Sequence, residues 1–112
     1  MQVVSWKNDN FESGKVLVHV LAQNSNAKEI QILMAQNSTM KEHKAPFDIS
    51  VQVLCGELEF TVGNETVTLK ELDMISLKAN EAHSLHALKD SIVRLSLAQS
   101  DTINRLQTVL KK

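Results

Sequence analysis

The chain has 112 residues and a formal net charge of −1, and 43% of its residues are hydrophobic while only 4% are aromatic. This length fits one domain, and the near-neutral charge provides no electrostatic basis for binding nucleic acid or an anionic membrane. No apolar run approaches the roughly 20 residues that a membrane helix needs. The first residues also lack the basic and then apolar pattern of a signal peptide. We therefore expect a cytoplasmic protein.

The single cysteine, Cys55, agrees with a reducing compartment because it has no internal disulfide partner. We interpret it as a small buried or half-buried strand residue. A catalytic thiol is the alternative, but no histidine in the sequence is obviously placed to activate it.

Short strand-like runs follow one another along the chain, with turn residues between them. These runs cover residues 15–21, 29–35, 49–54, 57–62, 65–69, 73–77, 83–87 and 91–97. Alternation is strictest before the hairpin signal Gly63-Asn64, where Leu58, Phe60 and Val62 share one face. Regularly spaced short strands predict an all-β sandwich or closed barrel.

The tail departs from this pattern. Ser100 or Asp101 can cap a helix in which Ile103, Leu106 and Leu110 recur at helical spacing. This predicts a short C-terminal α-helix over about 100–111, packed on the parent domain or on a partner subunit. We therefore predict one domain over 1–112, with a barrel over about 15–98.

The middle of the chain resembles the first motif of the cupin family, which reads His-x-His, three or four residues, Glu, six residues, Gly. Gly56 begins the run Gly-Glu-Leu-Glu-Phe and takes the position of the motif's glycine. Counting back with the three-residue spacer places His43 on the first histidine, Ala45 on the second and Ile49 on the glutamate. The resemblance implies a double-stranded β-helix, the RmlC-like jelly roll of small cupins, with its functional site inside the barrel.

A later segment resembles the second cupin motif, which reads Gly, five residues, Pro-x-Gly, two residues, His, three residues, Asn. The chain keeps the motif's histidine as His83 and replaces the other marked positions, with Leu72 for the first Gly, Lys78 for Pro, Asn80 for the second Gly and Ala87 for Asn. Asn80 is a physically sensible replacement because asparagine tolerates the left-handed conformation that a turn needs.

Cupins generally hold a divalent metal ion with three histidines and one glutamate, and the resemblance implies that two such positions, His43 and His83, remain here. Ala45 cannot ligate a metal, and Ile49 makes the wall apolar where a carboxylate belongs. Gln52 faces away from Ile49 by strand alternation and is a poor replacement. Two imidazoles without a carboxylate make a weak metal site, because open catalytic sites usually offer three protein ligands.

Alternation around His83 points Leu85 and Ala87 into the barrel and His86 out of it. For His43 or His83 taken alone, a hydrogen-bonded structural role is the simpler interpretation. Their positions in the two motifs together indicate one shared pocket. We predict a ligand pocket lined by His43, His83, Ile49, Val51 and Leu85.

Three further polar residues are interpreted as surface or interface residues rather than as part of the site. His19 is expected to be an edge or interface residue, and Arg94 to form a surface or interface salt bridge. Lys44 belongs to a solvated rim.

Three functions remain open. The first is a small-molecule-binding cupin without catalysis, and the second is a metal-dependent isomerase or dioxygenase using His43 and His83 with a divalent transition metal. The third is an oligomer-forming module. We also expect a homodimer, because pairing of subunits removes exposed strand edges. The sequence names neither the ligand nor a pathway.

Overall fold

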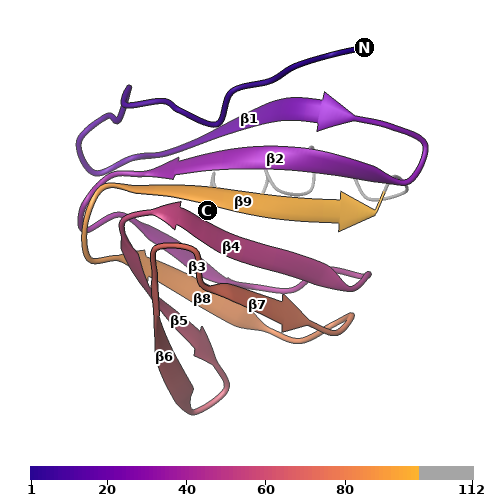
Figure 1. Cartoon of the computed structure of the whole chain (residues 1–112). Coiled ribbons are helices and arrows are strands. Elements are labelled where there is room, and N and C mark those ends of the chain that lie inside the picture. The colour runs from indigo at the N-terminus through magenta and orange to yellow at the C-terminus, as the bar shows by residue number, and fades with distance from the viewer. Residues whose placement is uncertain (99–112) are drawn as a thin grey trace.

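The computed structural model describes residues 1–98 (Figure 1). These residues form strands and loops without a helix, and the bounds of the strands are β1 (Val16–Gln23), β2 (Ala27–Met34), β3 (Thr39–His43), β4 (Ile49–Cys55), β5 (Glu57–Val62), β6 (Glu65–Lys70), β7 (Met74–Leu77), β8 (His83–Ala87) and β9 (Ser91–Ala98). The predicted all-β class is confirmed. The helix predicted over about 100–111 lies outside the described residues.

The strands build two antiparallel sheets that face each other. One sheet has the strand order β1-β2-β9-β4-β7 and the other has the order β3-β8-β5-β6. Their inward residues form one hydrophobic core in which aliphatic side chains dominate and Phe60 is the largest fully buried residue. Figure 1 shows the β5–β6 hairpin extending away from the five-stranded sheet. This arrangement is the double-stranded β-helix that the motif resemblance implied.

Each of the eight predicted runs overlaps an observed strand, and β3 is the strand that sequence reasoning missed. Its residues include Lys41 and Glu42 beside a single aliphatic position, Met40, which is 2% exposed. The pairing of β3 with β8 is also irregular between Met40 and His43. A short, irregular edge strand therefore shows no strict alternation in its sequence.

The turn positions of the two motifs keep the backbone conformations that their glycines would have. Gly56 has a φ of 101°, Leu72 a φ of 71° and Asn80 a φ of 67°. The expectation that Asn80 adopts the left-handed conformation is confirmed. Leu72 adopts that conformation although a branched aliphatic residue is disfavoured there.

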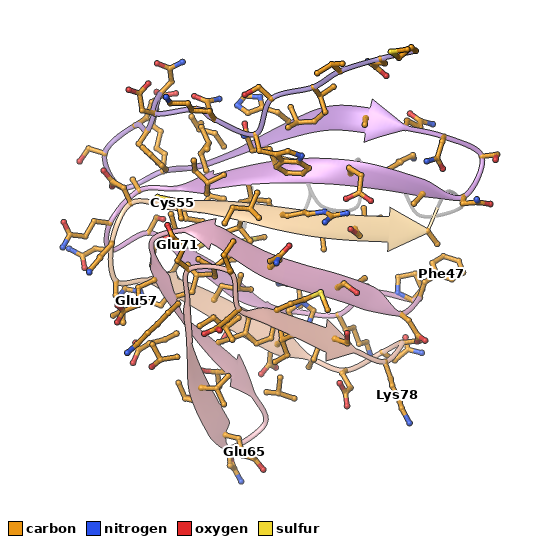
Figure 2. All side chains as sticks on the ribbon, in the orientation of Figure 1. Phe47, Cys55, Glu57, Glu65, Glu71 and Lys78 are labelled. Carbon is orange, nitrogen blue, oxygen red and sulfur yellow. The ribbon has the colours of Figure 1, made fainter. Side chains whose placement is uncertain are left out.

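The expectation that Cys55 is buried or half-buried is wrong, since its side chain is exposed at the end of β4 (Figure 2). Alternation from Ile49 through Val51 and Val53 would have turned Cys55 inward. The pairing of β4 with β9 instead shifts register between Val53 and Cys55. This bulge ends the alternation and turns Cys55 towards solvent.

The segment before β1 crosses the outer face of the five-stranded sheet. Gln31 of β2 lies beneath it, 1% exposed, and donates from Nε2 to the backbone oxygen of Trp6 at 2.8 Å. Asn8 donates to the Gln31 side-chain oxygen at 3.1 Å, and the guanidinium carbon of Arg94 lies 5.9 Å from the centre of the Trp6 ring. We call residues 1–15 the N-terminal strap. Within residues 1–98, no helix is long and apolar enough to cross a membrane.

Candidate functional site

The two histidines retained from the cupin motifs lie side by side. His43 ends β3, His83 begins β8, and the two are register partners across the pair of strands. Their ring centroids are 4.4 Å apart and the ring planes are tilted by 59°. Strand pairing therefore brings together two residues that are 40 positions apart in the chain.

Backbone carbonyls orient both rings. Nδ1 of His43 lies 2.6 Å from the carbonyl oxygen of Lys41, and Nδ1 of His83 lies 2.9 Å from that of Glu81. A carbonyl oxygen only accepts hydrogen bonds, so the ring proton of each neutral histidine is placed on Nδ1. In a ring that is neutral, Nε2 is then the nitrogen that carries the lone pair.

The buried ring of His83 is also held by packing. It is stacked on Phe60, with the ring centroids 5.4 Å apart and an interplanar angle of 8°. Phe60 is fully buried, and His83 itself is only 3% exposed. The stacked aromatic partner and the Glu81 carbonyl together fix the direction of this imidazole.

Both histidines line one cavity inside the barrel. The described residues around it are Ile32, Met40, His43, Ala45, Ile49, Val51, His83, Leu85 and Leu95. All five residues predicted for the pocket are among them. Sequence reasoning missed Ile32, Met40 and Leu95. Inward alternation along 29–35 could have indicated Ile32, and alternation along 91–97 could have indicated Leu95. Met40 was missed because it belongs to β3, which was not predicted.

The cavity is small. It offers about 20 Å³ for the centres of water molecules, which suits water or a ligand of only a few heavy atoms. Ala45 and Ile49, which replace motif ligands, are 4% and 6% exposed and contribute apolar wall. The substitutions that remove metal ligands therefore also make the interior more hydrophobic.

The residues present do not fit the metal shell implied by the fold. Among residues 1–98, no group of three or more His, Cys, Asp or Glu side chains is placed to hold a metal ion. His43 and His83 would supply two nitrogen ligands, and neither Ala45 nor Ile49 can add a third.

The other polar residues considered from the sequence lie away from the cavity. His86 is on the opposite face of β8, with Nδ1 2.8 Å from Thr39 Oγ1. Arg94 donates from Nε to Glu29 at 2.7 Å on the outer face of the five-stranded sheet, as its predicted salt bridge requires. Gln52 donates to the Leu72 carbonyl at 3.2 Å, and His19 is exposed on β1. Lys44 is exposed and is not among the residues lining the cavity.

The chain is similar in structure to solved proteins of cupin type. An RmlC-like cupin from Desulfovibrio desulfuricans superposes with a TM-score of 0.77 at 16% identity, covering 88% of this chain and 96% of that chain. A conserved protein of unknown function from Streptococcus pyogenes gives a TM-score of 0.71 at 20% identity, covering 91% and 98%. A cupin 2 conserved barrel domain protein from Leptotrichia buccalis gives 0.72 at 24% identity, covering 80% of this chain and 44% of that chain.

No protein-family model and no curated protein matches the sequence. The structural matches, which span nearly the full length of several proteins described as cupins, establish the cupin fold for this chain. The resemblance drawn from the Gly56 and His83 motifs is confirmed at this level. A fold hosts many functions, so the function has to be argued from the site.

Proposed function

We propose that the protein binds a compact small molecule inside the barrel, with His43 and His83 as its polar anchors. The observation that carries this proposal is the convergence of two oriented imidazoles on a cavity whose other lining residues are apolar. Ligand sites typically combine an apolar wall with a few placed polar groups. The small volume limits the ligand to a few heavy atoms unless the wall moves.

Met40 is the wall residue best suited to such movement. Its unbranched side chain adapts to irregular space, and it lies on β3, which pairs with β8 alone among the described strands. A somewhat larger ligand would therefore be accommodated first on the β3 side of the cavity.

Screening the protein with a library of small metabolites and fragments by ligand-observed NMR tests this function. We expect hits whose binding is lost in His83→Ala and weakened in His43→Ala. His86→Ala is the matched control, because it removes the same side chain from the opposite face of β8. The function is contradicted when no compound binds at millimolar concentration, or when His86→Ala abolishes binding as His83→Ala does.

A metal-dependent enzyme is the second candidate, and one observation favours it. Metal-binding histidines usually donate their other ring N–H to a carbonyl or carboxylate, and both Nδ1 atoms here face backbone carbonyls. Two protein ligands are nevertheless fewer than catalytic sites usually offer. We therefore propose that a small molecule, rather than a divalent transition metal, occupies the cavity that the two rings line.

Metal analysis separates the two candidates. We expect protein purified without added metal to contain far less than one equivalent of any transition metal. A stoichiometric metal that survives dialysis and is lost in both His43→Ala and His83→Ala would instead support the enzyme.

A further inference from the structure

The wall of the cavity consists of strands on most sides and of a loop on one side. Val51, Leu85 and Leu95 lie on β4, β8 and β9, and each of these strands is paired along both edges. Among the described lining residues, Ala45 alone lies on no strand, because it belongs to the loop 44–48 that joins β3 to β4. Moving a strand that is paired on both sides breaks two ladders of backbone hydrogen bonds. The loop is therefore the part of the wall that opens most easily.

Two successive backbone amides hold this loop against a second loop, 78–82, which joins β7 to β8. The N–H of Ala79 donates to Asp48 Oδ1 at 2.8 Å. The N–H of Asn80 donates to the carbonyl oxygen of Ala45 at 2.7 Å. The second of these bonds fixes the backbone of the residue that lines the cavity. The two loops therefore separate only when both bonds break.

The loop 44–48 buries little surface of its own. Ala45 is 4% exposed, whereas the other four residues of the loop are exposed, among them Phe47 at 38%. Figure 2 shows Phe47 of this loop and Lys78 of the other loop at the same end of the molecule. Segments with few buried contacts open locally while the rest of the fold stays intact. Opening of this end therefore uncovers little apolar surface.

We propose that the loops 44–48 and 78–82 form a gate over the cavity and that the Asp48 carboxylate is its latch. A hydrogen bond from a backbone N–H to a carboxylate is stronger than one between neutral groups. When the loops separate, Ala45 moves off the cavity beside His43, which is half-buried. The role of the gate as a ligand entrance rests on the binding function proposed above, but its opening occurs in the protein alone and is measured without a ligand.

Thiol labelling measures how often the cavity opens. Every labelled variant carries Cys55→Ser, which removes the exposed native thiol. Val51→Cys places a thiol in the cavity wall, where Val51 is 3% exposed. Val53→Cys is the matched control, because Val53 is the next inward residue of β4, is 0% exposed and is not among the residues that line the cavity. The reagent is methyl methanethiolsulfonate, which is small and uncharged, and mass spectrometry follows the modified fraction with time.

Loss of the latch should expose the cavity thiol selectively. We expect Asp48→Ala to speed the labelling of Val51→Cys at least about fivefold, because the Ala79 N–H loses its partner. Asp48→Asn should speed it less, since its side-chain oxygen still accepts that hydrogen bond. The labelling of Val53→Cys should change in Asp48→Ala only as far as the free energy of unfolding, measured in urea, accounts for it.

A second carboxylate controls for the loss of any such hydrogen bond. Asp73 Oδ2 accepts from the Lys70 backbone N–H at 2.9 Å in the turn between β6 and β7, away from the cavity lining. After correction for stability, Asp73→Ala should leave the labelling of Val51→Cys unchanged.

The outcomes distinguish the gate from the binding function. Equal labelling of Val51→Cys with and without the Asp48 carboxylate, or equal acceleration at Val51→Cys and Val53→Cys, overturns the gate and leaves the binding function standing. A selective acceleration, with no compound bound in the NMR screen, supports the gate's opening and overturns the binding function.

Amide hydrogen exchange provides the same test without cysteine variants, should Val51→Cys fail to fold. The Asn80 amide is the reporter, because its partner, the Ala45 carbonyl, is untouched by substitution of Asp48. Its exchange should rise at least about fivefold in Asp48→Ala and stay unchanged in Asp73→Ala. An Asn80 amide that exchanges equally in the unmodified chain and in Asp48→Ala overturns the gate.

Discussion

Gly56 is the residue at which the cupin-like turn depends most on the absence of a side chain. Its φ is 101°, and a Cβ built there would lie 2.5 Å from the Asp90 carbonyl oxygen and 2.7 Å from Ser91 Cα. Ser91 is fully buried and accepts from the Glu57 backbone N–H through its hydroxyl at 3.0 Å. The added methyl group therefore has no space to enter without breaking this corner.

We expect Gly56→Ala to lower the free energy of unfolding by about 3 kcal/mol or more, as backbone strain and overpacking combine. Gly14→Ala is the control, because Gly14 has a φ of 71° but nothing within 4 Å of its Cβ position. It should cost only about 1 kcal/mol of conformational strain. Urea unfolding measures both, and equal losses at the two positions would contradict the packing argument.

Leu72 presents the opposite situation. It adopts a φ of 71° and is 67% exposed, so its side chain contributes little burial to offset the strain of a left-handed backbone. We expect Leu72→Gly to raise the free energy of unfolding by about 1 kcal/mol. Leu72→Ala keeps the Cβ atom and should give no gain, and a less stable glycine variant would show that the strain is not significant.

At the scale of elements, the N-terminal strap depends on one buried amide. Both the oxygen and the nitrogen of the Gln31 side chain are used by strap atoms, from Asn8 and Trp6 respectively. We expect Gln31→Leu to lower stability by about 1 to 2 kcal/mol, because the strap groups lose their partners.

Limited trypsin digestion reports on the strap directly, since Lys7 lies within it. Cleavage after Lys7 should be faster in Gln31→Leu than in the unmodified chain. His19→Ala is the matched control, because His19 is the register partner of Gln31 on β1 and is exposed. Equal cleavage rates in all three proteins would mean that Gln31 does not hold the strap.

The elements also show what the sequence could and could not predict. Eight strands were recognised because aliphatic side chains alternate along them or because turn residues bound them, as in 57–62 before Gly63-Asn64. β3 was missed since charged residues and a register irregularity leave it one clear inward position, Met40. Cys55 was misplaced because a bulge in the β4–β9 pairing is invisible to a rule based on alternation.

The sequence predicted which residues form the candidate site, but it did not predict the size of the cavity. Motif spacing assigned His43 and His83 to histidine positions of the two cupin motifs. Strand alternation and motif position added Ile49, Val51 and Leu85 to the predicted pocket. The contact with Phe60, the carbonyl partners of the two Nδ1 atoms and the small volume all depend on three-dimensional packing. These packing features determine the proposed ligand class.

For the whole molecule, the sheet edges bear on the predicted homodimer. β1 has eight residues and pairs with β2 alone among the described strands, and its Val20 is 45% exposed. A long, largely apolar edge strand is a template for pairing with another chain. We therefore expect a dimer that uses the β1 edge.

Sedimentation velocity tests the dimer at high micromolar concentration. The unmodified chain should sediment as a dimer, and Val20→Lys, which places a charge on the edge strand, should shift it towards monomer. A monomer mass for the unmodified chain would contradict the predicted dimer. A dimer that persists in Val20→Lys would show that the interface does not use the β1 edge.

The most direct test of the central claim, that His43 and His83 form one ligand site inside the barrel, is a ¹⁵N NMR spectrum of the four imidazoles recorded with and without a compound that binds in the metabolite and fragment screen. The account predicts that both rings carry their proton on Nδ1, and that their Nε2 resonances move together and saturate while those of His19 and His86 stay in place. Protons on Nε2 of His43 and His83, or resonances of these two rings that do not respond to the ligand while it binds elsewhere, would contradict the account.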